Sequence, residues 1–117
     1  MVDPAYLVGA GAAIGAVLRP LAYEFVDARE LPIGTLTVNV VGSFVLGFVT
    51  FLGAGSDVLL FAGVGACGSY TTYSSFSFDI VRLWETESKE YAVVFAILNL
   101  AGALVAIGFA WLVAGAM

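Results

Sequence analysis

Long apolar runs alternate with short polar segments along the whole chain. A helix that crosses the roughly 30 Å hydrocarbon core of a membrane needs about 20 mostly apolar residues. Four runs meet this length, at residues 4–26, 33–53, 58–84 and 91–114. The pattern therefore predicts an all-α membrane protein with four transmembrane helices in a single domain over residues 1–117. Because the connections are short, consecutive helices are expected to lie antiparallel beside one another.

The charged residues between the runs predict an orientation. Lys and Arg are enriched on the cytoplasmic side of membrane proteins. Arg29, Arg82 and Lys89 all fall on the side of the first and third connections, which predicts that both termini face outward. Aromatic residues favour the membrane–water interface, and five of them stand near the ends of the runs: Tyr6, Tyr23, Trp84, Tyr91 and Trp111.

The composition narrows the classes of function that the chain can have. Of 117 residues, 62% are hydrophobic and only 11% are charged, whereas a soluble domain carries about 25% charge. Four basic residues against nine acidic ones make a nucleic-acid partner unfavourable. One cysteine excludes an intrachain disulfide and a cysteine metal cluster, and there is no histidine to act as a general base. These counts favour an integral protein of the cell membrane that contacts lipid along several crossings.

Small residues recur at helical spacing within the runs. Pairs four residues apart let helix backbones approach closely, and in lipid such packing replaces the hydrophobic drive. The pairs are Gly11 with Gly15, Ser43 with Gly47, and Gly102 with Ala106. Residues 39–42 (Asn-Val-Val-Gly) also resemble residues 99–102 (Asn-Leu-Ala-Gly). This likeness indicates either an internal repeat or a shared packing solution.

The middle of the third run is the strongest departure from a plain lipid-facing helix. Residues 69–75 all carry hydroxyl groups, and Ser77 adds another. Gly63, Gly65 and Gly68 precede them and would permit an unwound stretch. Unwound backbone at membrane depth persists only inside protein or beside a water-filled cavity. The pattern favours a third helix broken at mid-membrane; the alternative is a continuous helix whose hydroxyls bond to its own carbonyls.

Other intramembrane polar groups are candidates for function. Asn39 shares a helical face with Thr35 and Ser43, and either joins two helices or lines a polar pathway. Tyr73 and Phe76 also share a face; turned edge-on to a pathway they would favour an anion, and otherwise they form core packing. Arg19, beside Pro20, either extends to the interface or draws anions into a vestibule.

Four motifs together resemble the small fluoride-channel family known as Fluc or CrcB. They are the glycine-rich 9–19 ending in Arg19, the second-run stretch 32–44, the third-run stretch 65–77 and the fourth-run stretch 99–102. The resemblance extends over essentially the whole chain in order. It departs at two positions, because Tyr73 stands where the family usually has Phe and Ser69 where a second glycine is usual.

The resemblance implies a passive, fluoride-selective channel that exports cytoplasmic fluoride. Passive conduction needs no covalent chemistry, so we expect a non-enzyme. It implies an antiparallel dimer with a second subunit in inverted orientation, either an identical chain or a paralogue. The implied fluoride pathway consists of Asn39, Thr72, Tyr73, Ser75 and Phe76. A structural sodium ion would be held by the backbone carbonyls of Gly68 and Thr71. The alternatives are a small multidrug-type cation exporter, which needs a mid-span carboxylate that this chain lacks, and a non-conducting membrane scaffold.

Overall fold

The computed structural model describes residues 3–26 and 32–117, which are helical with short connections and contain no strand. The first connection, with Asp27, Arg29 and Glu30, lies outside the described residues. The elements are α1 (Pro4–Phe25), α2 (Ile33–Phe51), α3 (Ser56–Val58), η1 (Leu59–Cys67), α4 (Gly68–Tyr70), α5 (Ser74–Thr86) and α6 (Lys89–Gly115). These bounds confirm the four predicted runs to within about two residues, the uncertainty normal for helix ends.

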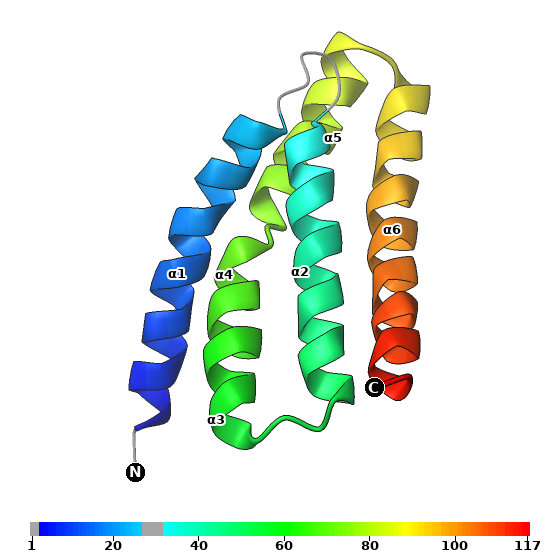
Figure 1. Ribbon diagram of the computed structural model, residues 1–117. Coiled ribbons are helices and arrows are strands. Elements are labelled where there is room, and N and C mark those ends of the chain that lie inside the picture. The colour runs from blue at the N-terminus through cyan, green and yellow to red at the C-terminus, as the bar shows by residue number, and fades with distance from the viewer. Residues whose placement is uncertain (1–2, 27–31) are drawn as a thin grey trace.

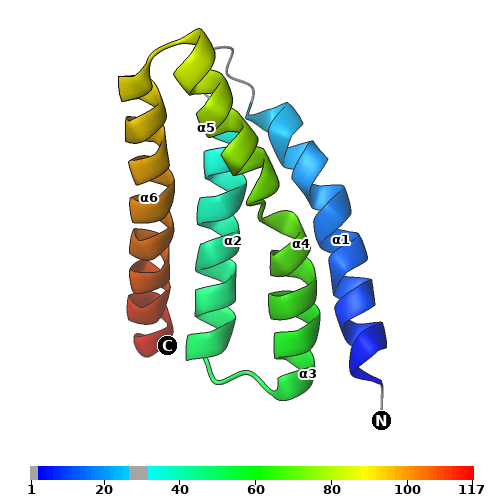
Figure 2. The same cartoon turned by 180° about the vertical axis from the view of Figure 1, so that it is seen from behind.

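The helices run side by side as an elongated bundle. In Figure 1 the beginning of α1 and the end of α6 lie at one end, together with the connection between α2 and α3. The connection between α5 and α6 lies at the opposite end, and the reverse view in Figure 2 agrees. Three helices, α1, α2 and α6, are each long and apolar enough to cross a membrane. The chain is therefore a multi-pass membrane protein with its third crossing in two pieces.

The third crossing is interrupted at residues 71–73, which confirms the predicted break. Helical structure continues from α3 through η1, a nine-residue π-helical segment, to the end of α4. Thr71 then adopts an extended backbone with φ −76° and ψ 163°, and α5 begins at Ser74. Figure 2 shows α5 leaving α4 at a changed direction. The break leaves backbone groups without helical partners at mid-bundle, where side chains must satisfy them.

The glycines of the third crossing do not unwind it, which corrects one expectation. Gly63 and Gly65 lie inside η1 and Gly68 begins α4, so all three are helical. Gly65 is buried, and a Cβ at this position would lie 2.6 Å from the Val8 carbonyl oxygen of α1. The absence of a side chain there lets two helix backbones touch. Gly65 thus serves packing and Gly63 lies against Leu46, whereas a Cβ at Gly68 would meet no neighbouring atom within 4 Å. The break falls on the hydroxyl residues that follow.

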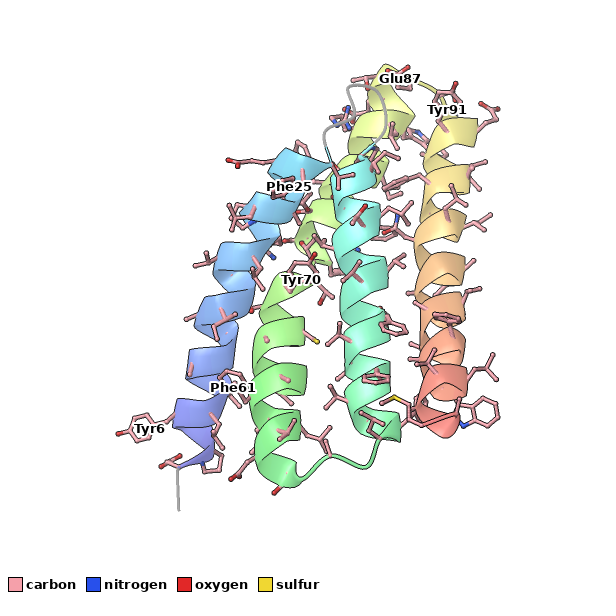
Figure 3. All side chains as sticks on the ribbon, in the orientation of Figure 1. Tyr6, Phe25, Phe61, Tyr70, Glu87 and Tyr91 are labelled. Atoms are coloured by element: carbon pink, nitrogen blue, oxygen red, sulfur yellow. The ribbon has the colours of Figure 1, made fainter. Side chains whose placement is uncertain are left out.

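Small residues form the predicted packing seams. Gly11 and Gly15 of α1 are buried and face backbone atoms of Phe61 and Ala66. Figure 3 shows the Phe61 ring on the side of its helix that faces α1. On the other side of the bundle, α2 packs along α6, where Gly47 faces Ala110. The prediction that these small residues mark helix contacts is confirmed.

The ends of the bundle carry caps and aromatic side chains. The Asp3 carboxylate accepts a hydrogen bond of 2.9 Å from the Ala5 amide, and the Ser88 hydroxyl accepts one of 3.0 Å from the Tyr91 amide. Such bonds satisfy amides that a helix start leaves unpaired. In Figure 3 Tyr6 lies near one end of the bundle and Tyr91 near the other, both partly or fully exposed. This placement suits two aromatic belts at the membrane interfaces.

Candidate functional site

The break in the third crossing meets α2 and α6 through a pair of asparagines. The Thr72 backbone amide, which in a continuous helix would bond to the Gly68 carbonyl, instead donates to Asn39 Oδ1 at 2.8 Å. Asn39 Nδ2 donates to Asn99 Oδ1 at 3.2 Å, and Asn99 Nδ2 donates to the Phe95 carbonyl at 3.1 Å. Asn99 is buried and Asn39 is half-buried. These bonds tie the break to both neighbouring helices.

The Thr72 side chain organises the start of α5. Its hydroxyl oxygen accepts a hydrogen bond of 3.0 Å from the Ser75 amide and lies 3.4 Å from the Ser74 hydroxyl. This is the geometry of a helix cap, three residues from the accepting side chain to the donating amide. Thr72 is only 7% exposed, so its cap is made within the protein. The Thr72 hydroxyl thus satisfies a backbone amide in the first turn of α5, directly after the break.

A groove of about 660 Å³ opens beside the break. Its lining contains Asn39, Thr72, Tyr73 and Phe76 of the predicted pathway, together with Asn99. The described lining contains no charged side chain. Further members of the lining are Gly42, Ser43, Leu46, Gly63, Val64, Cys67, Gly68, Thr71, Leu100 and Ala103. The groove thus combines amide and hydroxyl groups with apolar walls at the middle of the bundle.

Two aromatic side chains stand together at this groove. The ring centroids of Tyr73 and Phe76 are 6.0 Å apart with an angle of 37° between their planes. Phe76 also contacts Phe95 of α6, with centroids 6.5 Å apart. Phe76 is half-buried, whereas Tyr73 is 80% exposed. The pair is brought together as predicted, and most of the Tyr73 surface is exposed on the outside of the bundle.

Arg19 reaches the break instead of the membrane interface. Its guanidinium nitrogen Nη1 donates to the Thr71 carbonyl oxygen at 3.3 Å. The half-buried side chain therefore supplies a donor to a carbonyl that the broken helix leaves free. Gly68, the other residue predicted to present a carbonyl, lies on the 660 Å³ groove. Arg19 is not among the lining residues of that groove.

Ser75 does not line the 660 Å³ groove with the other predicted pathway residues, although its amide bonds to Thr72. It lines a second groove, of about 460 Å³, with Ser74, Thr35 and Asp79. There the Thr35 hydroxyl donates to Asp79 Oδ2 at 2.7 Å, so the Tyr23 hydroxyl, 3.1 Å away, must donate to Thr35. This groove lies toward the end of the bundle where α1 ends and α2 begins. The polar positions thus divide between two grooves: the described lining of the 660 Å³ groove holds no charged side chain, and that of the 460 Å³ groove holds one carboxylate, Asp79.

Two participants were not among the predicted site residues. The sequence indicates Asn99 only as a member of the possible repeat and of the fourth-run motif, although the chain holds just two asparagines and no glutamine. The similarity of residues 39–42 and 99–102 was the signal, because the two asparagines bond to one another. Asp79 is the second participant, and its bond to Thr35 depends on how α5 resumes after the break.

Comparison with known proteins gives the family. A family described as "CrcB-like protein, Camphor Resistance (CrcB)" matches residues 6–116. The chain belongs to the CrcB family. A relative from Haloarcula marismortui named "Fluoride-specific ion channel FluC 2" is 52% identical over 109 residues, covering 93% of this chain and 92% of the relative. "Fluoride-specific ion channel FluC 1" from Halobacterium salinarum is 50% identical with the same coverage.

The match to the CrcB family extends beyond these two relatives. A protein from Methanosarcina barkeri, also named "Fluoride-specific ion channel FluC 1", is 37% identical over 109 residues, 92% of this chain and 93% of its own length. The resemblance deduced from four motifs is therefore confirmed at the level of the family. Relatives named as ion channels also agree with the expectation of a membrane protein that is not an enzyme.

Proposed function

We propose that this chain is a passive, fluoride-selective channel that lets cytoplasmic fluoride leave the cell. The observation that carries the proposal is the agreement between relatives named as fluoride-specific channels and a charge-free groove containing a buried amide network. A small halide is strongly hydrated, so a pore must replace the water hydrogen bonds with fixed donors. A fixed cation in the groove would hold the ion too strongly for rapid exit.

The donors for fluoride come from both sides of the break. Asn39 Nδ2 carries two hydrogens and uses one for Asn99, which leaves the second for an anion in the groove. Thr72 accepts from the Ser75 amide, so its own hydroxyl hydrogen can rotate toward an ion or toward Ser74. Tyr73 and Phe76 contribute the positive edges of their rings. Ser75, on the 460 Å³ groove, would receive the ion nearer the membrane surface.

A second subunit in inverted orientation completes this proposal. Tyr73 is 80% exposed at the middle of the bundle, and a partner would cover it together with the open side of the groove. The partner is an identical chain or a paralogue, and Arg29, Arg82 and Lys89 on one side favour a fixed orientation for each chain. Membrane lipid surrounds the remaining apolar faces.

The proposed sodium ion suits the donors near the break. Backbone carbonyl oxygens are ligands that hard cations take. The Gly68 carbonyl loses its helical donor because the Thr72 amide bonds to Asn39. The Thr71 carbonyl accepts from Arg19, but a carbonyl oxygen has a second lone pair. These two carbonyls would hold the ion, which would bind subunits together and stabilise the break.

Fluoride efflux from proteoliposomes, followed with a fluoride electrode, tests the proposal. Wild-type protein is expected to release fluoride without a proton gradient. Asn39→Ala removes the central donor and is expected to reduce the flux by about 100-fold or more while the protein still elutes as an assembled species. Transport of organic cations driven by a pH gradient would favour the exporter, and an intact protein without any flux would favour the scaffold.

A further inference from the structure

The hydrogen-bond partners of the two asparagines fix which side-chain amide donates to the other. The Thr72 amide can only donate, so the atom of Asn39 that faces it at 2.8 Å must be the carbonyl oxygen. The Phe95 carbonyl can only accept, so the atom of Asn99 that faces it at 3.1 Å must be the amide nitrogen. Both ends of the network therefore require the same direction of donation, from Asn39 Nδ2 to Asn99 Oδ1.

This direction determines how Asn39 meets the groove. Asn39 is bonded at its oxygen by the break and at its nitrogen by α6, so its amide plane is held by two separate elements. Asn99 is 5% exposed and is itself anchored to the backbone of α6, one turn earlier. Without Asn99 the Asn39 amide would keep a single anchor and could rotate its nitrogen away from the groove.

We infer that Asn99 is a positioning residue for fluoride selectivity, which orients the Asn39 amide so that a hydrogen on Nδ2 faces the groove. The inference rests on the proposed function, since it concerns how the donor for fluoride is aligned. An aligned donor offsets the dehydration free energy of a small anion better than that of a larger anion, because a short hydrogen bond requires the donor at a fixed distance. Loss of Asn99 therefore weakens selectivity as well as flux.

Flux measurements separate this inference from a purely structural role. Asn99→Leu keeps the volume of the side chain and removes the acceptor for Asn39 Nδ2. We expect fluoride flux to fall by about tenfold, the size commonly found when an orienting partner is removed, and the ratio of fluoride to chloride flux to fall with it. In the Asn39→Ala background, adding Asn99→Leu should change neither quantity further, because the residue acts through Asn39. Thr50→Ala, on the distant end of α2, serves as the control with unchanged flux.

Each negative result contradicts a different part of the argument. No fluoride flux from the wild type would reject the proposed function together with the inference. Full flux in Asn39→Ala would reject the role of Asn39. If Asn39→Ala loses flux while Asn99→Leu keeps both flux and selectivity, the positioning role alone is overturned. Additive losses in the double variant would also overturn it, since they would show that Asn99 acts independently of Asn39.

Nuclear magnetic resonance of ¹⁵N-labelled protein in micelles provides a readout other than transport. The chain contains two asparagines and no glutamine, so its spectrum holds two side-chain amide pairs. We expect fluoride to shift the Asn39 pair in the wild type and to leave it unshifted in Asn99→Leu. If Asn99→Leu does not assemble, Asn99→Asp replaces it, because the neutral carboxyl group keeps both bonds: its carbonyl oxygen accepts from Asn39 Nδ2 and its hydroxyl donates to the Phe95 carbonyl in place of Nδ2. The Asn39 pair should then stay near its wild-type position. An Asn39 pair at the position of a free amide in Asn99→Asp would overturn the inference.

Discussion

The two halves of the third crossing use their residues for opposite purposes. Residues 59–67 contain glycine, alanine and apolar side chains, and they lie against the backbone of α1 along a seam of buried glycines. Residues 71–77 are rich in hydroxyl groups, and they interrupt the helix, bond to Asn39 and line the grooves. In this crossing the helix is broken where polar partners from other helices are available, while the glycine-containing half stays helical.

The largest effect should follow from disturbing the glycine seam. Gly11→Ala adds a Cβ that meets the Phe61 carbonyl and lies 2.9 Å from the Ala66 backbone nitrogen. These are backbone atoms, so α1 and η1 must separate, and overpacking of this kind costs about 1–3 kcal/mol. We expect a lower unfolding free energy in mixed micelles, measured by denaturant titration.

Gly9 provides a matched control for Gly11 on the same helix. A Cβ at Gly9 meets no atom within 4 Å. Gly9→Ala should therefore raise stability slightly, by about 0.5–1 kcal/mol, because alanine loses less backbone entropy than glycine in a helix. Equal effects of the two substitutions would contradict the close approach of α1 to η1.

A smaller effect is expected from removing the cap at the break. Thr72→Ala deletes the oxygen that accepts from the Ser75 amide, and losing such a cap costs about 0.5–2 kcal/mol. Thr72→Ser keeps the oxygen and should retain most of the stability and the fluoride flux. Unfolding titrations and liposome efflux of both variants check this. An Ala variant as stable and active as the Ser variant would show that α5 restarts without its cap.

Sequence reasoning succeeded where a pattern has a single structural solution. Four apolar runs of sufficient length predicted the crossings, and small residues four apart predicted the seams of Gly11, Gly15 and Gly47. It placed the break in the right crossing because seven consecutive hydroxyl-bearing residues are not expected on a plain lipid-facing helix. It gave Gly63, Gly65 and Gly68 as residues that would permit unwinding, since glycine suits both unwinding and close packing and the sequence alone does not distinguish the two.

The arrangement of the site depended on information that a pattern does not contain. The bond between Asn39 and Asn99 joins residues 60 positions apart, and its direction follows from what each amide faces. The partner of Arg19 was likewise undetermined, because a long side chain near a span end reaches either the interface or a buried carbonyl. Thr71 became that partner only through its extended backbone. Pairings of this kind are set by the three-dimensional register of the helices.

The smallest effect tests whether the hydroxyl groups of the third crossing are equivalent. The Ser69 hydroxyl donates to the Ala66 carbonyl of its own helix at 3.2 Å, which is the self-bonding arrangement considered for the whole stretch. The Thr72 hydroxyl instead accepts from an amide across the break. Ser69→Ala should therefore change the unfolding free energy by no more than about 0.5 kcal/mol and leave fluoride efflux near the wild-type rate. Thr72→Ala is expected to lower both the unfolding free energy and the fluoride efflux. Measuring the two variants side by side therefore distinguishes a hydroxyl that bonds to its own helix from the one that caps α5. A loss in Ser69→Ala as large as that in Thr72→Ala would mean that the stretch acts as a whole, and the distinction between its members would fail.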